Sequence, residues 1–228
     1  PCSWLVIPDN RSRLSPVNFQ DTQLIGVLAR AESTVSSLSD LLGGLVEKFA
    51  ARGYSLYLVG GSVRDALLGR LGNDLDFTTP ARPDVVKEIL DEWAETVWDT
   101  GIDFGTVSAA YKGQQIEITT FRSDSYDGQS RNPEVVYGDT LEGDLVRRDF
   151  KVNAMAIELL ADASFTFHDP LHGLQDVADR VLDTPDKPEI SFHDDPLRML
   201  RAARFASQLE FRVADRVVDA MRDMAGEI

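Results

Sequence analysis

An Asp-Leu-Asp tripeptide carries the clearest chemistry in this sequence. Asp74 and Asp76 stand two residues apart at the start of a predicted strand, Leu75–Thr79. Side chains at i and i+2 of a strand point to the same face. Two neighbouring carboxylates repel each other unless a cation lies between them, and their oxygens suit hard cations such as Mg²⁺. The alternative is an exposed acidic turn after Gly72-Asn73.

A third acid, Glu117, lies in a predicted strand, Gln114–Thr120. The alternation of residues places Glu117 on the face opposite to Ile116 and Ile118. Glu117 either faces water on a solvated sheet face or joins the Asp pair as a third carboxylate. The residues alone leave both possibilities open.

A Gly60-Gly61 pair separates a predicted strand, Tyr54–Val59, from a predicted helix, Ser62–Leu68. Glycines permit positive φ and a close backbone approach. The free N–H groups at a helix start favour an anion such as phosphate, and Arg64 adds a positive charge. A plain strand-to-helix turn is the alternative.

A polar cluster follows in the second half of the chain, formed by Arg147, Arg148, Asp149 and Asn153. Arginine binds phosphates well, and Asp or Asn can bond ribose hydroxyls. Taken alone, these residues fit a salt-bridged helix start better than a nucleotide site.

Asp195 and Arg198 open a predicted helix, Ser191–Leu209, and Arg201 continues the same face. A carboxylate can accept a bond from an exocyclic amine while a guanidinium donates to the adjacent ring atom. Cytosine and adenine offer that amine, whereas uracil and guanine present a carbonyl. Ordinary helix capping by Asp is the alternative.

The composition narrows the class of protein. The chain has 228 residues, of which 43% are hydrophobic, and a formal net charge of −15. This excludes a disordered chain and argues against non-specific DNA coating, which requires basic residues. A single cysteine excludes an internal disulfide and a Cys-rich zinc site, and a reducing compartment is the default. No apolar run approaches the length of a membrane span, so we expect a cytoplasmic protein.

The order of predicted elements places an α+β unit before a helical one. Beside the strands above, we expect a strand at Gly105–Tyr111, a strand pair within Ala156–Phe167 and a long polar loop at 121–144. Predicted helices are Ser39–Ala51, with Ser39 as its N-cap, Pro83–Val97, Leu174–Arg180 and Ala214–Met224. This order predicts an α+β fold, in which a mixed-sheet head precedes an all-helical neck. We divide the chain into an N-terminal extension (1–35), a head (36–170) and a neck (171–228).

Several segments in this order resemble the class II tRNA nucleotidyltransferases. That family comprises the CCA-adding enzymes and the similar bacterial poly(A) polymerases of the polymerase-β-like superfamily. The segments are LVGGSVRDALLG and DLDF (58–69, 74–77), IEITTFR (116–122), LVRRDFKVNAMAI (145–157), DPLHGLQDV (169–177) and HDDPLRMLRAARF (193–205). The resemblance runs from about residue 54 to residue 211.

The resemblance implies a role for each matched residue. Asp74 and Asp76 would hold two Mg²⁺ ions, with Glu117 as the assisting catalytic carboxylate. Nucleotide-binding residues would be Gly60, Gly61, Arg64, Arg148, Asp149, Asn153, Asp195, Arg198 and Arg201. Asp194 stands where the family often has Glu, which leaves its role open.

The implied activity is the addition of CMP, CMP and AMP to the 3′ end of tRNA, with CTP, ATP and tRNA as partners and no membrane. The segment 121–144, which includes Tyr126–Arg131, resembles the flexible loop that the family needs for adding A. Further helical domains follow the neck in this family, so we expect a part of a longer protein. The alternatives are a poly(A) polymerase and a non-catalytic nucleotide- or RNA-binding module.

Overall fold

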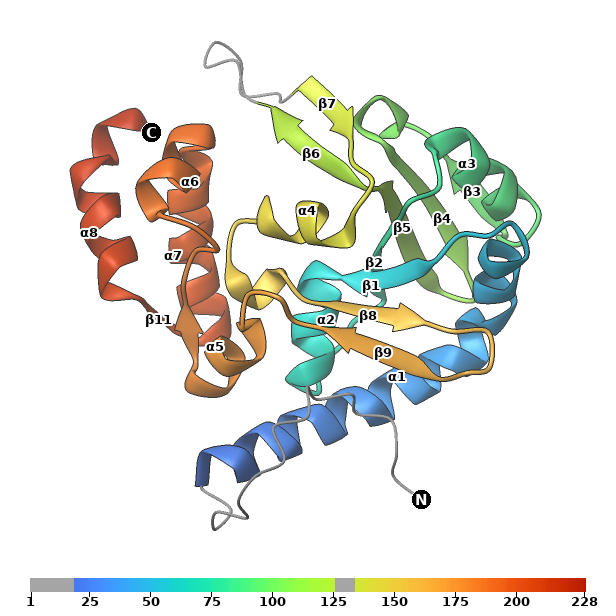
Figure 1. Ribbon diagram of the computed structural model, residues 1–228, viewed down its shortest axis with the longest axis horizontal. Coiled ribbons are helices and arrows are strands. Elements are labelled where there is room, and N and C mark those ends of the chain that lie inside the picture. The colour runs from blue at the N-terminus through green and yellow to red at the C-terminus, as the bar shows by residue number, and fades with distance from the viewer. Residues whose placement is uncertain (1–18, 126–133) are drawn as a thin grey trace.

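The computed structural model describes residues 19–125 and 134–228 (Figure 1). Its largest sheet has the strand order β3-β4-β5-β2-β1-β8-β9. The strands are β3 (Thr96–Trp98), β4 (Thr106–Tyr111), β5 (Gln114–Thr120), β2 (Asp74–Thr79), β1 (Leu56–Val59), β8 (Ala156–Leu159) and β9 (Phe165–His168). The sheet is mixed, because β2 and β5 pair in parallel and the other neighbours are antiparallel.

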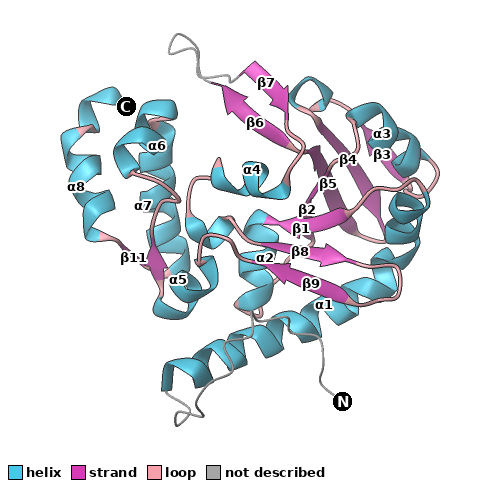
Figure 2. Ribbon diagram, viewed as in Figure 1, coloured by secondary structure: helices cyan, strands magenta, loops and turns pink. Residues whose placement is uncertain are grey.

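Three helices cover one face of this sheet, as Figure 2 shows. They are α1 (Phe19–Ala51), α2 (Gly60–Leu67) and α3 (Pro83–Asp91). Alternation along the strands explains the two faces. In β2, Leu75 and Phe77 are buried in the main hydrophobic core while Asp74 and Asp76 are exposed. The same holds across the parallel register, where Leu75 lies beside Ile116 and Asp76 beside Glu117.

The helical part of the chain packs beside the head. It consists of α5 (Gly173–Asp179), α6 (Pro188–Asp194), α7 (Leu197–Leu209), α8 (Asp215–Asp223) and the short 3₁₀ helix η3 (Ala225–Glu227). Phe192, Met199, Val217 and Ala220 form a small core of its own. One short parallel pair, β10 (Val181–Leu182) with β11 (Arg212–Val213), lies within it, so this part is not wholly helical. The predicted α+β class is confirmed.

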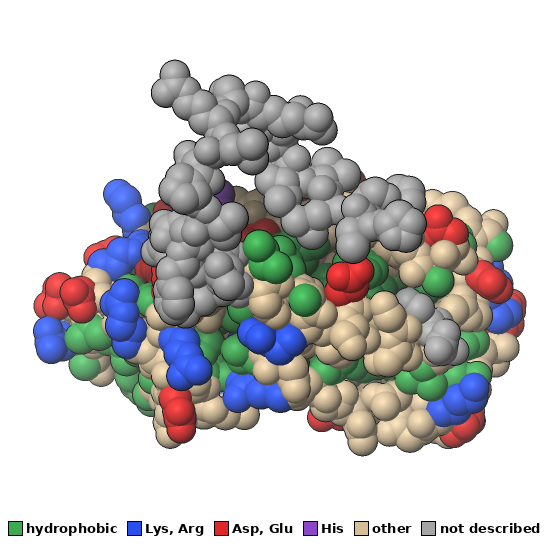
Figure 3. All heavy atoms as spheres, turned by 90° about the horizontal axis from the view of Figure 1, so that it is seen from below, with side chains coloured by type: hydrophobic (Ala, Val, Ile, Leu, Met, Phe, Trp, Pro, Cys, Tyr) green, Lys and Arg blue, Asp and Glu red, His purple; other side chains and the backbone are tan. Residues whose placement is uncertain are grey.

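The first helix is much longer than predicted. It begins at Phe19 rather than at Ser39. Its N-terminal half carries Val27, Ala31 and Val35, which are buried because the helix lies across α2 and α5. The single helix crosses the boundary that we placed at residue 35, and the three-part division of the chain stays a prediction. Figure 3 views the molecule from the side of α1 and shows hydrophobic and charged side chains interspersed there.

Two other predicted helices are also corrected. The helix predicted over Pro83–Val97 ends at Asp91, and its last residues enter strand β3. The helix predicted over Ser191–Leu209 is two helices, α6 and α7, which are separated at Asp195 and Pro196. Proline lacks an N–H group and disfavours helical backbone in the residue before it, which explains the break.

The predicted loop at 121–144 contains regular structure. It holds the antiparallel pair β6 (Arg122–Ser125) and β7 (Glu134–Tyr137) and the start of α4 (Leu141–Val146). Tyr126–Arg131, which resembles the family's flexible loop, lies outside the described residues. A two-residue hairpin turn at Lys112-Gly113 joins β4 to β5, with φ of 47° and 80° at these two residues. Among the described helices, none is long and apolar enough to cross a membrane.

Candidate active site

The three predicted carboxylates share the face of the sheet that α1, α2 and α3 leave open. Asp74 and Asp76 point from β2, and Glu117 lies beside Asp76 on the paired strand β5. The sequence left open whether Glu117 faces water alone or joins the pair, and the parallel register brings it next to Asp76. The sequence could not settle this, because strand pairing is a long-range property.

Asp76 experiences this crowding of negative charge. Burial raises the pKa of Asp76 above its ordinary value, and the charges of Glu117 and Asp74 raise it further. Arg148 and Arg64 act in the opposite direction. The open sheet face still leaves Asp76 an exposed residue. A raised carboxylate pKa among like charges means that the site favours an added positive charge.

The donor set fits a hard divalent cation in its chemistry, because all three groups are carboxylates. In the described part of the chain, however, no three Asp, Glu, His or Cys side chains are gathered closely enough to hold a metal ion. The three carboxylates therefore share a face of the sheet but do not form a complete metal-coordination site among the described residues.

The glycine turn places backbone directly beside these acids. Gly60 has a φ of +67°, which L side chains rarely adopt. A Cβ atom at Gly60 would lie 3.0 Å from Nη1 of Arg148 and 3.8 Å from Oδ2 of Asp76. Ser62 fixes the turn, because its Oγ donates to the Asp74 carbonyl (3.3 Å) and accepts from the Asp76 amide (2.9 Å). Sequence reasoning missed Ser62, although it follows the glycines directly.

Arg64 is buried, with 6% of its surface exposed. Its Nη1 donates to Oδ1 of Asn153 at 2.6 Å, and Nε and Nη2 donate to the carboxylate of Asp65. The guanidinium also lies 5.2 Å from the ring centroid of Phe205. Arg64 is thus held on several sides, with its place in the wall of the cavity fixed in advance.

Asp149 joins the head to the helical part. Its Oδ1 accepts from Asn153 Nδ2 (2.9 Å) and from the Phe150 amide (2.9 Å). Its Oδ2 accepts from Nε of Arg201 at 2.7 Å. Both carboxylate oxygens are therefore engaged by protein groups, and a bond to a ribose hydroxyl would have to share or replace one of them.

Asp144 of α4 orients the Arg148 side chain toward the glycine turn. The sequence analysis did not single out Asp144. Nη2 of Arg148 donates to Oδ2 of Asp144 at 2.9 Å, while Arg147 donates to Oδ1 at 3.0 Å. Burial alone would raise the pKa of Asp144, but the two arginines outweigh it and hold the pKa below its ordinary value. An acid three and four residues before a pair of arginines was the available signal.

Asp195 and Arg198 lie at the start of α7, where the Arg198 amide donates to the Asp195 carbonyl at 3.0 Å and the two side chains bond to other groups. Oδ1 of Asp195 accepts from the amide of Leu197, the first residue of α7, at 3.0 Å, although the N-cap position itself is Pro196. Arg198 donates to Oγ of Ser191 (2.8 Å) and to the Arg147 carbonyl (2.9 Å). Arg198 thereby ties α7 to the end of α4.

Of the catalytic, metal-binding and nucleotide-binding residues that the resemblance implies, all except Asp74 and Glu117 line one cavity of about 690 Å³ between the open sheet face and α7. Its wall also includes residues outside the predicted set, which are Arg122, Arg147, Arg204, Phe205 and Gln208. One side of the cavity is basic and the other carries Asp76, so the cavity can accept a polyanion together with a cation. Its volume is in the range of small-molecule sites.

Comparison with known proteins identifies the family of this chain. A family model described as "Poly A polymerase head domain" matches residues 56–183. A CCA-adding enzyme of Lactobacillus helveticus is 42% identical over 172 residues, covering 75% of this chain and 41% of that protein. One of Listeria monocytogenes is 39% identical over 183 residues, covering 80% and 44%.

Solved structures resemble the chain in fold as well. The CCA-adding enzyme of Bacillus stearothermophilus in complex with CTP has a TM-score of 0.68 at 36% identity, covering 80% of this chain and 42% of that one. A tRNA nucleotidyltransferase complexed with a primer tRNA and an incoming ATP analog has a TM-score of 0.66 at 30% identity, covering 84% and 50%. The chain spans less than half the length of these curated relatives.

Proposed function

Because this chain belongs to the poly A polymerase head domain family, we propose that it carries the catalytic site of a CCA-adding enzyme. The substrates are CTP and ATP, and the acceptor is the 3′ end of a tRNA. The main support is that Asp76 and Glu117 lie side by side on an open sheet face, opposite Gly60 and an arginine-lined wall. The relatives named above carry these activities in their descriptions.

The reaction is a displacement at the α-phosphorus of the nucleotide. The 3′-hydroxyl oxygen of the RNA forms the new bond to phosphorus, and the bond from phosphorus to the pyrophosphate oxygen breaks. Two Mg²⁺ ions held by Asp74 and Asp76, with Glu117 beside them, would supply charge neutralisation and lower the pKa of that hydroxyl.

The chain's own residues position the reactants. Gly60 and Gly61 let the triphosphate approach the backbone at the start of α2, where free N–H groups favour anions. Arg64, Arg148 and Arg201 supply positive charge around it from three elements. Because each arginine is already held by a carboxylate or amide, little ordering remains to be done when the nucleotide binds.

Nucleotide choice is assigned to Asp195 and Arg198. Oδ1 of Asp195 is used for capping, and Oδ2 has no hydrogen-bond partner among the described residues, so it can accept from the amine of cytosine or adenine. Arg198 can donate to the neighbouring ring atom. Uracil and guanine would present a carbonyl to the carboxylate and leave both groups unpaired.

The test is incubation of the purified protein with Mg²⁺, a tRNA transcript that lacks its terminal CCA, and labelled CTP or ATP separately. We expect incorporation of CMP, and of AMP once CMP is in place. Asp74→Asn and Asp76→Asn should each lower incorporation by at least about 100-fold, because metal-assisted charge stabilisation is worth several kcal/mol. Asp84→Asn, at an exposed position on α3, is the matched control and should leave the rate unchanged.

A poly(A) polymerase is the second candidate, because the matching family model carries that description. Use of ATP on RNA without any use of CTP would support it and contradict the first proposal. Binding of nucleotide with no transfer of either would indicate a non-catalytic module.

A further inference from the structure

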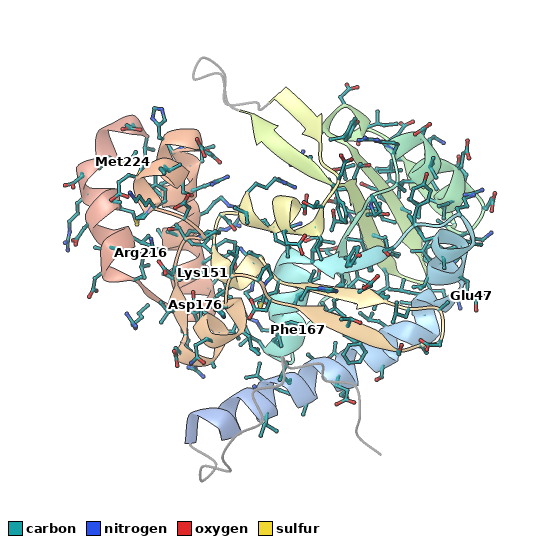
Figure 4. All side chains as sticks on the ribbon, viewed as in Figure 1. Glu47, Lys151, Phe167, Asp176, Arg216 and Met224 are labelled. Atoms are coloured by element: carbon teal, nitrogen blue, oxygen red, sulfur yellow. The ribbon has the colours of Figure 1, made fainter. Side chains whose placement is uncertain are left out.

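An ionic junction formed by Lys151, Asp183 and Arg216 joins the head to the helical part, outside the lining of the nucleotide cavity. Lys151 donates from Nζ to Oδ2 of Asp183 at 2.8 Å, and Arg216 donates from Nε to Oδ1 of the same carboxylate at 2.7 Å. Figure 4 shows Lys151 and Arg216 near Asp176 on the side of the molecule where α5 meets β11. None of these residues lines the cavity. Asp183 therefore bridges two cations from different parts of the chain.

On the head side, Lys151 begins the 3₁₀ turn η2 (Lys151–Asn153). Its backbone amide donates to the Asp183 carbonyl at 2.9 Å, in addition to the side-chain ion pair. The same turn ends at Asn153, which bonds both Arg64 and Asp149. Because Lys151 and Asn153 belong to the same 3₁₀ turn, a displacement of Lys151 would also move Asn153. It would thereby disturb the hydrogen bonds that hold Arg64 and, through Asp149, Arg201.

On the helical side, Arg216 belongs to α8. Its guanidinium also donates to the carbonyls of Thr184 (2.7 Å) and Asp186 (3.1 Å), which fixes the segment before α6. Val217 of α8 packs with Met199 of α7 in the small core. Because α7 carries Arg198 and Arg201, Arg216 sets the placement of the basic wall of the cavity.

A competing partner for Lys151 lies close by. Oδ2 of Asp176 is buried and has no hydrogen-bond partner within residues 19–125 and 134–228, and Lys151 is its main favourable charge. If Asp183 lost its charge, Lys151 would be drawn toward Asp176. The Lys151 side chain would then pair with α5 and no longer connect η2 to the segment before α6 that Arg216 holds.

We propose that Asp183 is a positioning residue for nucleotide binding, which holds the basic wall on α7 at its working distance from the catalytic face through Lys151 and Arg216. The inference rests on the proposed nucleotidyl transfer. Asp183 touches no reacting atom, so its loss should weaken nucleotide binding and leave the chemical step largely intact.

Steady-state kinetics with the variants Asp183→Asn and Lys151→Met test whether nucleotide binding is weakened while the chemical step is kept. Each should raise the KM for CTP and ATP by about tenfold, with kcat changed less than about twofold. The double variant should be no worse than either single one, because the two groups act as one unit. Asp219→Asn is the matched control, since Asp219 also pairs with an arginine on α8 but is 68% exposed.

A distance measurement separates this inference from the proposed function. Spin labels at Glu88→Cys on α3 and Asp223→Cys on α8, with Cys2→Ser, report the spacing of head and helical part. We expect a broader distance distribution in Asp183→Asn and no change in Asp219→Asn. An unchanged distribution, or additive kinetic losses in the double variant, would overturn the inference. If the parent protein transfers no nucleotide, the proposed function fails and the distances alone decide on Asp183.

Discussion

Replacing Asp144 by Asn should weaken the contacts that hold Arg147 and Arg148 in the cavity wall. The Asp144 side chain is 0% exposed, and it accepts hydrogen bonds from Arg147 (3.0 and 3.2 Å) and Arg148 (2.9 Å). An amide has nearly the same shape as a carboxylate but carries no charge and only one acceptor oxygen. Arg147 and Arg148 would then lose the charge of the one carboxylate that both of them contact.

The expected loss of stability is about 2–4 kcal/mol. Removing one partner of a buried ion pair costs about 3–5 kcal/mol, because the other charge stays buried and unpaired. Arg147 and Arg148 keep 17% and 18% of their side-chain surface exposed, so water recovers part of this cost. Nucleotide affinity should fall as well, because Arg148 loses the contact that aims it at Gly60.

Urea unfolding of the parent and of Asp144→Asn, followed by circular dichroism, measures this difference. The pKa of Asp144 is lowered in the folded state, so its contribution is complete above the ordinary carboxyl pKa near 4 and is lost as pH falls through the folded pKa. The difference between the two proteins should therefore be constant from pH 5 to 8 and shrink below about pH 4. Glu142→Gln, an exposed acid on the same helix, is the control. A difference below about 1 kcal/mol at pH 7 would refute the reasoning.

Three other substitutions test separate features. Gly173→Ala should destabilise the fold by more than about 3 kcal/mol in the same unfolding assay, because a Cβ there would collide with the Lys151 carbonyl oxygen. Gly43→Ala, in the C-terminal third of α1 with open space around it, should instead stabilise the protein by about 0.5–1 kcal/mol; a loss would contradict a helical backbone with open space at Gly43. Burial raises the pKa of Asp176 to about 6, so the folded state binds its proton more tightly and this carboxyl lowers stability as pH rises from about 4 to 6. Asp176→Asn should therefore gain about 1 kcal/mol at pH 7 and nothing at pH 4, since partial exposure screens the charge; equal effects at both pH values would rule out this cause.

Local patterns in the sequence predicted most of the sheet. The strand Gln114–Thr120 was predicted with the bounds that the structure gives it, because strict alternation of Ile116 and Ile118 with polar residues leaves one register. The long helix α1 was predicted only in its C-terminal part. In its N-terminal half Val27, Ala31 and Val35 do recur at helical spacing, but we predicted no helix there; the helix is stabilised by packing of these residues in the core and by contacts with α2 and α5.

In the candidate site, too, local features were predicted from the sequence and long-range contacts were not. The residue types that could bind metal, phosphate and base were all visible as short motifs, because each motif is local. Their partners were not visible. Arg64 and Asn153 are 89 positions apart, and Arg201 and Asp149 are 52 apart. Neither member of each pair indicates, from its own local sequence, that it is hydrogen-bonded to the other.

The sequence by itself therefore determined the chemistry that is present and the face of each strand that carries it, since both follow from residue type and a period of two. Only the tertiary structure decided that Glu117 stands beside Asp76, that Asp144 holds Arg148, and that Asp183 joins the two halves of the cavity. The physical reason is that ion pairs and strand registers depend on which surfaces meet after folding. Burial and hydrophobic packing set those meetings, and they act between residues far apart in the chain.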